Sequence, residues 1–448
     1  MAVRRAETVY TAERGYRLTA DRAVQLARLA PARRGLLDRA AAVALAHAAP
    51  PYLVGGGVRD LLLGRATLDL DVVVVGDALA VARALHDDLG GAARARLRAH
   101  EAFGTATLTL HDGPALDLIT ARREQYPAPG ALPLVFPGSL DDDLRRRDFT
   151  INAIALDLAP GAGGALLDPL GGRADLAAGV IRVLHEGSFA DDPTRLLRAA
   201  RYAGRLAFDL APRTAALFRA AVGAGALGTV TPQRLSHEFV RLLAEPLAAT
   251  MLDALVATDA LAQIAPGSRW DDESRAANAR LVALSPALPS APGGAPALWA
   301  ARFALLVAHL APEAAWAVAS GLHVPGGAIE LARQVATLRA LLAQGVPTTS
   351  DAALGRLLDP FSAAAVATTA ALLPDPATRQ TLLRYLTTIR SLVPRLGGAA
   401  LKALGVAPGP IYREALGALR DFKRDTPDAT SEDERAFLQR WLALRGAG

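Results

Sequence analysis

The chain has no cysteine among its 448 residues. Disulfide bonds, zinc–thiolate centres and cysteine nucleophiles are therefore excluded, and no disulfide-linked partner is expected. Aromatic residues make up only 5% of the chain. So few aromatic side chains argue against an extended platform on which successive single-stranded bases stack.

Long apolar runs are also absent. The most apolar region, residues 297–322, is interrupted by Arg302, His309, Pro312 and Glu313. No run reaches the roughly 18 residues that a membrane-spanning helix needs. The N-terminal segment carries basic residues but no apolar stretch behind them, unlike a secretory signal. These absences predict a cytoplasmic protein with no membrane partner.

Lysine is scarce as well. Lys402 and Lys423 are the only lysines, so arginine supplies almost all of the 49 basic residues, and the formal net charge is +5. Arginine binds phosphate through two parallel N–H donors, which favours a nucleotide or nucleic-acid partner. We attribute most of the arginine count to a coding bias towards alanine and arginine in a GC-rich genome. Only local arginine clusters therefore indicate function.

Two kinds of pattern divide the chain. Between about residues 51 and 158, short β-like runs are bounded by glycine, proline and aspartate, and a helical pattern at residues 77–89 lies between two of them. After Ser188 almost no strand pattern remains. Ser431 and Glu434 are placed to form a capping box for the last predicted helix. The fold class is therefore α+β, with a mixed α/β head and a long helical remainder.

Two carboxylates stand at the start of a strand that is otherwise apolar, in LVGGGVRDLLLGRATLDLDVVVVGD. Residues two apart in a strand share a face, so Asp69 and Asp71 lie side by side. Such a pair repels and is costly to bury unless a divalent cation lies between the two groups. Mg²⁺ takes oxygen ligands and keeps positions open for substrate phosphates. A pair of solvated aspartates at a strand end is the alternative, and a D-x-D pattern alone favours that alternative.

The surrounding residues shift the balance towards a nucleotide site. Gly55, Gly56 and Gly57 let backbone N–H groups approach phosphate closely, and the helix that begins near Arg59 has an N-terminus that favours an anion. A third carboxylate, Asp117, lies in another β-like run and is a candidate ligand of the same metal ions. An ordinary edge-strand aspartate explains Asp117 equally well.

These stretches resemble the class II tRNA nucleotidyltransferases and bacterial poly(A) polymerases, which share a polymerase-β-like head. Four further stretches carry the resemblance, so that together it covers about residues 50–245. The family's ribose-recognition motif resembles RRRDFTINAIALD (145–157), and its hinge resembles LLDPLGGRADLAAGVIRVL (166–184). Its base-reading helix resembles SFADDPTRLLRAARYAGRLAF (188–208). Its supporting helix resembles TPQRLSHEF (231–239), which contains Arg234 and Glu238.

The resemblance implies a division into parts and a set of site residues. Asp69 and Asp71 would be catalytic and would bind Mg²⁺, together with Asp117. Asp148 would accept a hydrogen bond from the ribose 2′-hydroxyl. The expected parts are an N-terminal helical segment (1–50), a nucleotidyltransferase head (51–160), a neck (161–245), a helical body (246–350) and a helical tail (351–448). The expected nucleotide-binding residues are Gly55, Gly56, Arg59, Arg147, Asp148, Asn152, Asp192, Arg195 and Arg198.

The base-reading segment also has a purely structural explanation. Asp192 followed by proline is a common helix start, and arginines three residues apart lie near one face of the helix. The resemblance adds that Asp192 and Arg195 would pair with the edge of an incoming cytosine or adenine. Both explanations can hold together. The family usually has glutamate where this chain has Asp191, which leaves the role of that residue open.

The resemblance implies a template-independent enzyme that adds C, A or both from CTP and ATP to the 3′ end of tRNA. A poly(A) polymerase acting on mRNA is the alternative enzyme, and an inactive RNA-binding protein with this head is the alternative of another class. Residues 120–140 lie where the family keeps a flexible loop, but they contain four prolines and lack an acidic-x-x-Arg pattern. That departure favours addition of only part of CCA. The sequence does not indicate an oligomeric state.

Overall fold

A computed structural model describes residue 26 and residues 29–66, 70–159, 165–284, 298–345 and 350–445. Its contacts divide the chain into two compact units, which meet in sequence between Val230 and Thr231. This boundary falls within the segment predicted as a neck, and the five-part division stays a prediction.

The first unit is built on a seven-stranded mixed sheet with the order β3-β4-β5-β2-β1-β8-β9. Strands β2 and β5 are parallel, and the other neighbouring pairs are antiparallel. The valines of β2 are fully buried, as β-branched side chains in a central strand should be. The strands are β1 (Pro51–Val54), β2 (Asp71–Val74), β3 (Ala95–His100), β4 (Thr105–Leu110), β5 (Ala115–Thr120), β8 (Ala155–Asp157) and β9 (Leu166–Leu167).

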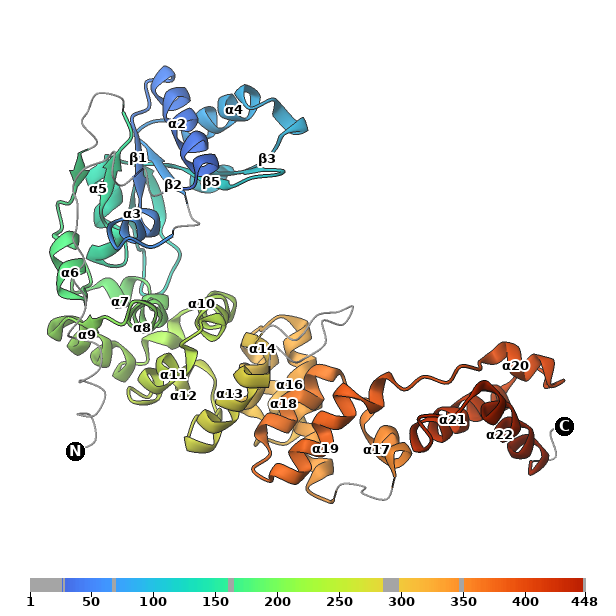
Figure 1. Cartoon of the computed structure of the whole chain (residues 1–448). Coiled ribbons are helices and arrows are strands. Elements are labelled where there is room, and N and C mark those ends of the chain that lie inside the picture. The colour runs from blue at the N-terminus through green and yellow to red at the C-terminus, as the bar shows by residue number, and fades with distance from the viewer. Residues whose placement is uncertain are drawn as a thin grey trace. The chain divides into compact units, whose positions relative to one another are not determined.

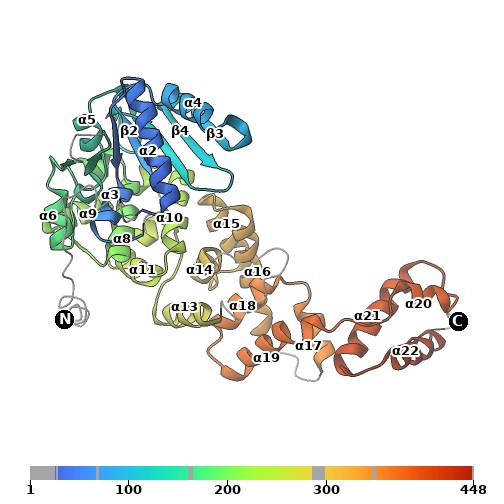
Figure 2. The ribbon, with the colours of Figure 1, turned by 45° about the horizontal axis from the view of Figure 1, so that its top comes forward.

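Helices α2 (Pro31–Ala46) and α4 (Ala78–Asp88) form one layer against this sheet (Figures 1 and 2). The Asp77 side chain begins α4 by accepting hydrogen bonds from the backbone N–H groups of the first turn. The covered face carries buried residues such as Leu116 and Leu118 of β5. Because side chains alternate in a strand, residues such as Asp117 lie on the opposite face.

Shorter elements complete the first unit. Strands β6 (Arg122–Gln125) and β7 (Leu134–Pro137) form a separate hairpin. Gly172 packs so tightly that a Cβ there would lie 2.1 Å from the Thr150 carbonyl oxygen. The helices are α3 (Gly56–Leu62), α5 (Leu140–Arg145), α6 (Gly172–Ala178), α7 (Ser188–Asp191), α8 (Thr194–Leu206) and α9 (Pro212–Gly223). Two short strands, β10 (Val180–Ile181) before α7 and β11 (Asp209–Leu210) after α8, form a parallel pair.

Among the described residues, the second unit is entirely helical, as predicted for the remainder of the chain. Arg302 is buried at its centre and donates hydrogen bonds to carbonyl oxygens at the end of α10, including those of Leu243 and Glu245 at 2.7 Å. The helices are α10 (Pro232–Ala244), α11 (Ala248–Val256), α12 (Ala260–Ile264), α13 (Asp272–Leu284), α14 (Leu298–Val307), α15 (Pro312–Gly321), α16 (Gly326–Leu342), α17 (Asp351–Leu358), α18 (Ala363–Leu372), α19 (Pro376–Thr387), α20 (Gly398–Ala403), α21 (Pro410–Asp425) and α22 (Ser431–Ala443).

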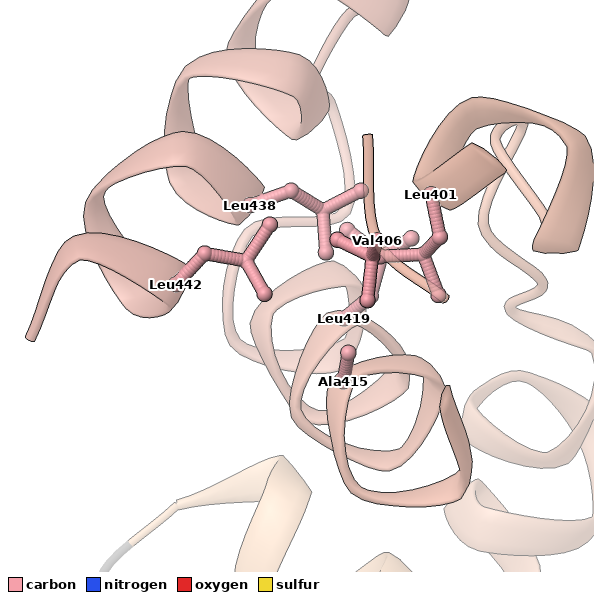
Figure 3. Close-up of a cluster of buried hydrophobic side chains, with 6 residues drawn as sticks. All are labelled: Leu401, Val406, Ala415, Leu419, Leu438 and Leu442. Carbon is pink, nitrogen blue, oxygen red and sulfur yellow. The ribbon is translucent and has the colours of Figure 1, made fainter. Parts of the chain in front are cut away.

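The last three helices enclose a small apolar cluster of six side chains (Figure 3). The cap of α22 differs from the predicted one by one residue, because Thr430 and Asp433 form the capping box. Glu434 is instead fully buried and accepts hydrogen bonds from the backbone N–H groups of Arg395 and Leu396. The predicted cap was wrong because Glu434 is buried and bonds to these backbone N–H groups instead of capping the helix. The cluster consists of Leu401, Val406, Ala415, Leu419, Leu438 and Leu442.

Candidate active site

Two of the predicted metal-binding carboxylates meet across neighbouring strands. Asp71 begins β2 and lies in register with Asp117 of the parallel strand β5, so both side chains occupy the sheet face opposite α2 and α4. Thr107 of β4 is in register with Asp117 and donates a 2.6 Å hydrogen bond to its Oδ1. Asp69 lies outside the described residues.

The glycine turn after β1 closes over this carboxylate pair. Gly55 has φ +71°, and a Cβ on it would lie 3.0 Å from Arg147 Nη1 and 3.4 Å from Asp71 Oδ2. A side chain at this position would therefore strain the backbone and press on both charged groups. The structure thus brings Gly55, Asp71 and Arg147 together, as the sequence predicts. Gly56 is the first residue of α3.

The donor set fits a hard divalent cation. Asp71 and Asp117 offer carboxylate oxygens from adjacent strands, and magnesium is usually held by one or two carboxylates with substrate phosphates completing its shell. Among the described residues, no group of three or more histidine, aspartate or glutamate side chains forms a metal site by itself. A site here therefore depends on the two carboxylates, on Asp69 and on the substrate.

A buried aspartate organises the arginine cluster. Asp143 is fully buried; its Oδ1 accepts from Arg146 and its Oδ2 accepts from Arg147 at 2.8 Å. Burial by itself would raise the pKa of Asp143, but the two guanidinium groups outweigh burial and lower the pKa below its usual value. Asp143 therefore stays charged and fixes Arg147 beside Gly55.

Arg59 has a different environment from the one predicted. Its exposed fraction is only 2%, and its guanidinium donates to Asp60 Oδ1 at 2.9 Å and to Asn152 Oδ1 at 2.8 Å. The guanidinium also lies 5.1 Å from the ring centre of Tyr202. A group so enclosed does not fit direct contact with a triphosphate. It fits a supporting role in which Arg59 holds the Asn152 side chain in place through this hydrogen bond.

Asp148 joins the head to helix α8 through a partly buried ion pair with Arg198. Its Oδ1 accepts from the Phe149 N–H at 2.8 Å and from Asn152 Nδ2 at 3.0 Å, and its Oδ2 accepts from Arg198 Nε at 2.9 Å and Nη2 at 2.5 Å. Four donors fill the lone-pair directions of a carboxylate. Asp148, Asn152 and Arg198 are therefore brought together, as predicted, but their hydrogen bonds are first of all to one another.

The two residues predicted to read the base lie where α7 ends and α8 begins. Asp192 Oδ1 accepts from the Thr194 N–H at 3.1 Å and from Thr194 Oγ1 at 2.7 Å, but the N-cap position of α8 is Pro193, one residue after the predicted cap. Arg195 has an exposed fraction of 4% and donates to Ser188 Oγ at 2.7 Å and to the Arg146 carbonyl oxygen at 2.9 Å. Arg195 is thus held rigidly against the arginine cluster of the head.

Comparison with known proteins identifies this arrangement. Residues 51–182 match the family described as the poly(A) polymerase head domain, and residues 207–270 match the family described as a probable RNA and SrmB-binding site of polymerase A. The CC-adding tRNA nucleotidyltransferase of Deinococcus radiodurans is 37% identical over 399 residues, which are 87% of this chain and 89% of that protein. The chain belongs to the tRNA nucleotidyltransferase family.

Two further comparisons bear on this nucleotidyltransferase. The A-adding tRNA nucleotidyltransferase of Halalkalibacterium halodurans is 46% identical over 196 residues, but the match spans only 43% of this chain and 45% of that relative. The structure of the Thermotoga maritima CCA-adding enzyme complexed with tRNA has a TM-score of 0.75 and 28% identity, covering 95% of this chain and 99% of that chain. The predicted fold and enzyme class are thereby confirmed.

Family membership also implies dependence on a divalent metal ion, which agrees with the carboxylate pair.

None of the helices that the structure describes is both long enough and apolar enough to cross a lipid bilayer.

A part of the site that nothing in the sequence indicates comes from the β6–β7 hairpin. Tyr126 donates to Glu124 Oε2 at 3.1 Å and accepts from Arg195 Nη2 at 3.5 Å, while Glu124 Oε1 also pairs with Arg122 and Arg146. Burial is the largest of several causes that raise the pKa of Tyr126 to about 12, so its hydroxyl stays a donor at neutral pH. The hairpin thus connects the arginine cluster to the predicted base-reading arginine.

The turn of this hairpin is anchored by contacts with later residues of the same unit. Gly130 has φ +71° and donates its N–H to the Ala190 carbonyl oxygen at 3.1 Å. A Cβ on Gly130 would lie 2.3 Å from Thr229 Oγ1. Residues 122–137 therefore form a docked hairpin, although the family resemblance indicates a flexible loop at residues 120–140.

Tyr202 is a second residue that the sequence does not single out. The guanidinium groups of Arg59, Arg198 and Arg201 lie 5.1, 5.6 and 4.8 Å from its ring centre, and Phe149 meets the ring edge-on at 5.8 Å. Cations over an aromatic ring are attracted by its quadrupole. Tyr202 therefore gathers arginines from α3 and α8 around one ring. Its only sequence signal is an aromatic residue four positions after Arg198.

The Asp148–Arg198 ion pair predicts a specific acid sensitivity. Burial opposes ionisation of Asp148, but Arg198 and Asn152 outweigh burial and lower its pKa to about 2 from 3.8. A depressed pKa stabilises the folded state above the unfolded-state pKa, and this contribution, about 2 kcal/mol, is lost as the pH falls from 4 to 2.

The variant Asp148→Asn should therefore be less stable than the wild type at pH 7, because Arg198 loses its charged partner. The difference in unfolding free energy between the two proteins should shrink between pH 4 and pH 2. Denaturant titrations of both proteins across this pH range measure it. A difference that does not change with pH would contradict the assigned ion pair.

Proposed function

We propose that this chain extends the 3′ end of tRNA with nucleotides taken from CTP or ATP, in the cytoplasm and with Mg²⁺ as its metal ion. The observation that carries the proposal is the registered pair Asp71 and Asp117 on one sheet face, beside the Gly55 turn and Arg147. Carboxylates, a glycine turn and an arginine are the groups that hold a metal-bound triphosphate.

In this proposal, Asp69, Asp71 and Asp117 hold magnesium, which when bound would make the terminal hydroxyl of the RNA more acidic and neutralise charge on the departing pyrophosphate. Gly55 and Gly56 offer backbone N–H groups to the triphosphate, and Arg147 binds its oxygens. Arg59 acts from below by fixing Asn152. The protein's contribution to the rate is then positioning and charge stabilisation.

Asp148 would recognise the ribose by exchanging a protein donor for the 2′-hydroxyl. Its three donor residues differ in accessibility: Phe149 and Asn152 are at most 5% exposed, whereas the Arg198 side chain is 27% exposed. Arg198 is therefore the donor that the ribose 2′-hydroxyl replaces on Asp148. A ribonucleotide restores the lost hydrogen bond and a deoxyribonucleotide cannot, which favours ribonucleotides.

The base would be read by Asp192 as acceptor and Arg195 as donor. Three N–H contacts of Arg195 already go to Ser188, Tyr126 and Arg146 among the described residues. The guanidinium has five N–H groups in a fixed fork, so the remaining ones point in a fixed direction. A rigid donor of this kind suits recognition of one base edge without a nucleic-acid template.

We propose that the product is CC, added in two steps to tRNA that lacks its CCA end. A relative that is 37% identical over 87% of this chain and 89% of its own length is a CC-adding enzyme. Addition of the terminal A alone is the second candidate, because the A-adding relative is 46% identical over the shorter region that it matches. A poly(A) polymerase remains the alternative with a different acceptor. An inactive RNA-binding protein is disfavoured, since Asp71, Asp117 and Arg147 are all in place.

The test uses the purified full chain with three tRNA acceptors, lacking CCA, ending in C and ending in CC, each offered labelled CTP or ATP alone. We expect two C additions to the first acceptor, one to the second and none to the third, with no use of ATP. Extension of only the third acceptor with ATP would establish the second candidate instead. Extension of an oligo(A) primer in preference to every tRNA would refute the tRNA proposal.

A further inference from the structure

An exposed, basic strip continues the catalytic face of the sheet towards its edge. Strand β3 forms one edge of the sheet (Figure 1), and Arg98 on it is in register with Thr107 of β4, which is in register with Asp117 of β5. Asp117 is in register with Asp71. Residues directly opposite in neighbouring strands share a face, so Arg98 lies in one row with the two carboxylates.

Arg96 extends the strip along the same strand. It is two residues from Arg98 and therefore on the same face, in register with Thr109. Both arginines are exposed, whereas Ala95, on the other face of β3, is buried towards α4. Neither guanidinium has a carboxylate or hydrogen-bonding partner in the part of the chain that the structure describes.

The positions of these arginines match a second substrate better than the first. The proposed triphosphate groups, Gly55 and Arg147, lie on the β1 side of Asp71, whereas the strip lies on the β5 side. An acceptor strand must bring its 3′-hydroxyl to the carboxylates from a direction that the triphosphate leaves open. Arg98 is three strands from Asp71, about 14 Å, which is the reach of one or two nucleotides upstream of a 3′ end.

The spacing along the strand also suits a nucleic-acid backbone. Arg96 and Arg98 are about 7 Å apart, since a strand rises about 3.4 Å per residue. Successive phosphates of an extended strand are separated by a similar distance, and each arginine can grip one phosphate with two donors. Between the arginines and the carboxylates lie exposed Thr109 and half-buried Thr107, which leave this path polar.

We infer that Arg96 and Arg98 bind consecutive phosphates of the single-stranded 3′ end of the acceptor RNA and guide it across β4 to Asp117 and Asp71. The inference rests on the proposed function, because it assumes an RNA acceptor. A competing explanation is that charges on an edge strand only prevent pairing with another chain. That role is served by charge of either sign, which separates the two explanations.

The experiment compares Arg96→Ala/Arg98→Ala, Arg96→Glu/Arg98→Glu and Arg96→Lys/Arg98→Lys with the wild type. The matched control is Arg34→Ala/Arg83→Ala, which removes the same charge from the exposed helix layer on the other side of the sheet. The dissociation constant for tRNA ending in the first C, which has two unpaired 3′ nucleotides, is measured at several salt concentrations, with the KM for CTP as a second readout.

We expect the alanine pair to weaken tRNA binding about tenfold at low salt, and to reduce the slope of log Kd against log salt by about 1.4, because two single-strand phosphate contacts are lost. The glutamate pair should bind still more weakly, and the lysine pair, which keeps the charge but not the two-donor contact, should bind between the alanine pair and the wild type. The control should bind nearly as the wild type, and the KM for CTP should stay within about twofold. A tRNA trimmed of its unpaired 3′ nucleotides should bind wild type and variants alike.

Unchanged tRNA affinity and salt slope in the glutamate pair would overturn the inference and leave edge protection as the explanation. A raised KM for CTP with unchanged tRNA binding would also overturn it, because it would place the arginines on the nucleotide. A wild-type enzyme that extends no tRNA would instead refute the proposed function, which is a separate outcome.

Discussion

Replacing Asp71 with asparagine is expected to lower kcat for nucleotide addition by about a thousand-fold or more, while the protein remains folded. Such a loss corresponds to about 4 kcal/mol of transition-state stabilisation. The reason is that Asp71 faces Asp117 across two parallel strands and has the Gly55 turn and Arg147 beside it. No other described side chain is placed to supply a carboxylate at the same position in the row.

A thermal-stability readout separates catalysis from folding. Like charges directly opposite in a sheet repel, so Asp71→Asn should melt at the same temperature as the wild type or higher in the presence of a chelator. Magnesium should stabilise the wild type more than the variant, because it binds the carboxylate pair.

The matched control is Asp77→Asn, the same chemical change a few residues further on, where asparagine can still cap α4. It should keep near wild-type activity. Full activity in Asp71→Asn, or an equal loss in Asp77→Asn, would contradict the proposed role of Asp71.

The second large effect is expected at Arg195. The variant Arg195→Ala should lose about a hundredfold or more in kcat/KM for the preferred nucleotide, and the preference between CTP and ATP should collapse. A hydrogen-bonding site rejects the wrong ligand strongly because unpaired buried groups are costly, and each bidentate contact contributes about 1–3 kcal/mol of discrimination. The measurement is kcat/KM for CTP, ATP and UTP with one tRNA acceptor.

Graded variants separate base reading from folding of α8. Arg195→Lys keeps the charge but not the fork, so it should retain stability and still lose discrimination. Tyr126→Phe should have a smaller effect of about fivefold, because it removes only one contact that holds Arg195. Arg205→Ala, on an exposed position of the same helix, should be close to wild type. Retained discrimination in Arg195→Ala would show that other groups read the base.

The sequence predicts the parts of this site whose residues lie close together in the chain. The glycine turn, Asp71, the Arg147–Asp148 pair and the Asp192–Arg195 pair each lie within a few residues of a recognisable pattern. Local chemistry explains why: a glycine with φ +71°, an aspartate at a helix start and a carboxylate at a strand start all leave a mark on neighbouring residues.

The parts that the sequence does not reveal depend on strand register and on distant contacts. Arg98 joins the row of Asp117 only because β3 and β4 pair in one particular register, and a shift of one residue would move it to the other face. Tyr126 meets Arg195 across 69 residues of sequence. Arg59 has the sequence position of a phosphate ligand, but the packing of α3 against Asn152 and Tyr202 buries it.

The central claim is that Asp71 and Asp117 hold a metal ion against a nucleoside triphosphate. The most direct test is a crystal structure of the full chain with Mn²⁺ in place of Mg²⁺ and a non-hydrolysable CTP analogue, with the manganese located by its anomalous scattering. The account predicts a manganese peak bonded to Asp71 and to the triphosphate, within reach of Asp117 and close to the Gly55 turn. A triphosphate bound elsewhere, or a manganese ion with no carboxylate from β2 or β5, would contradict it.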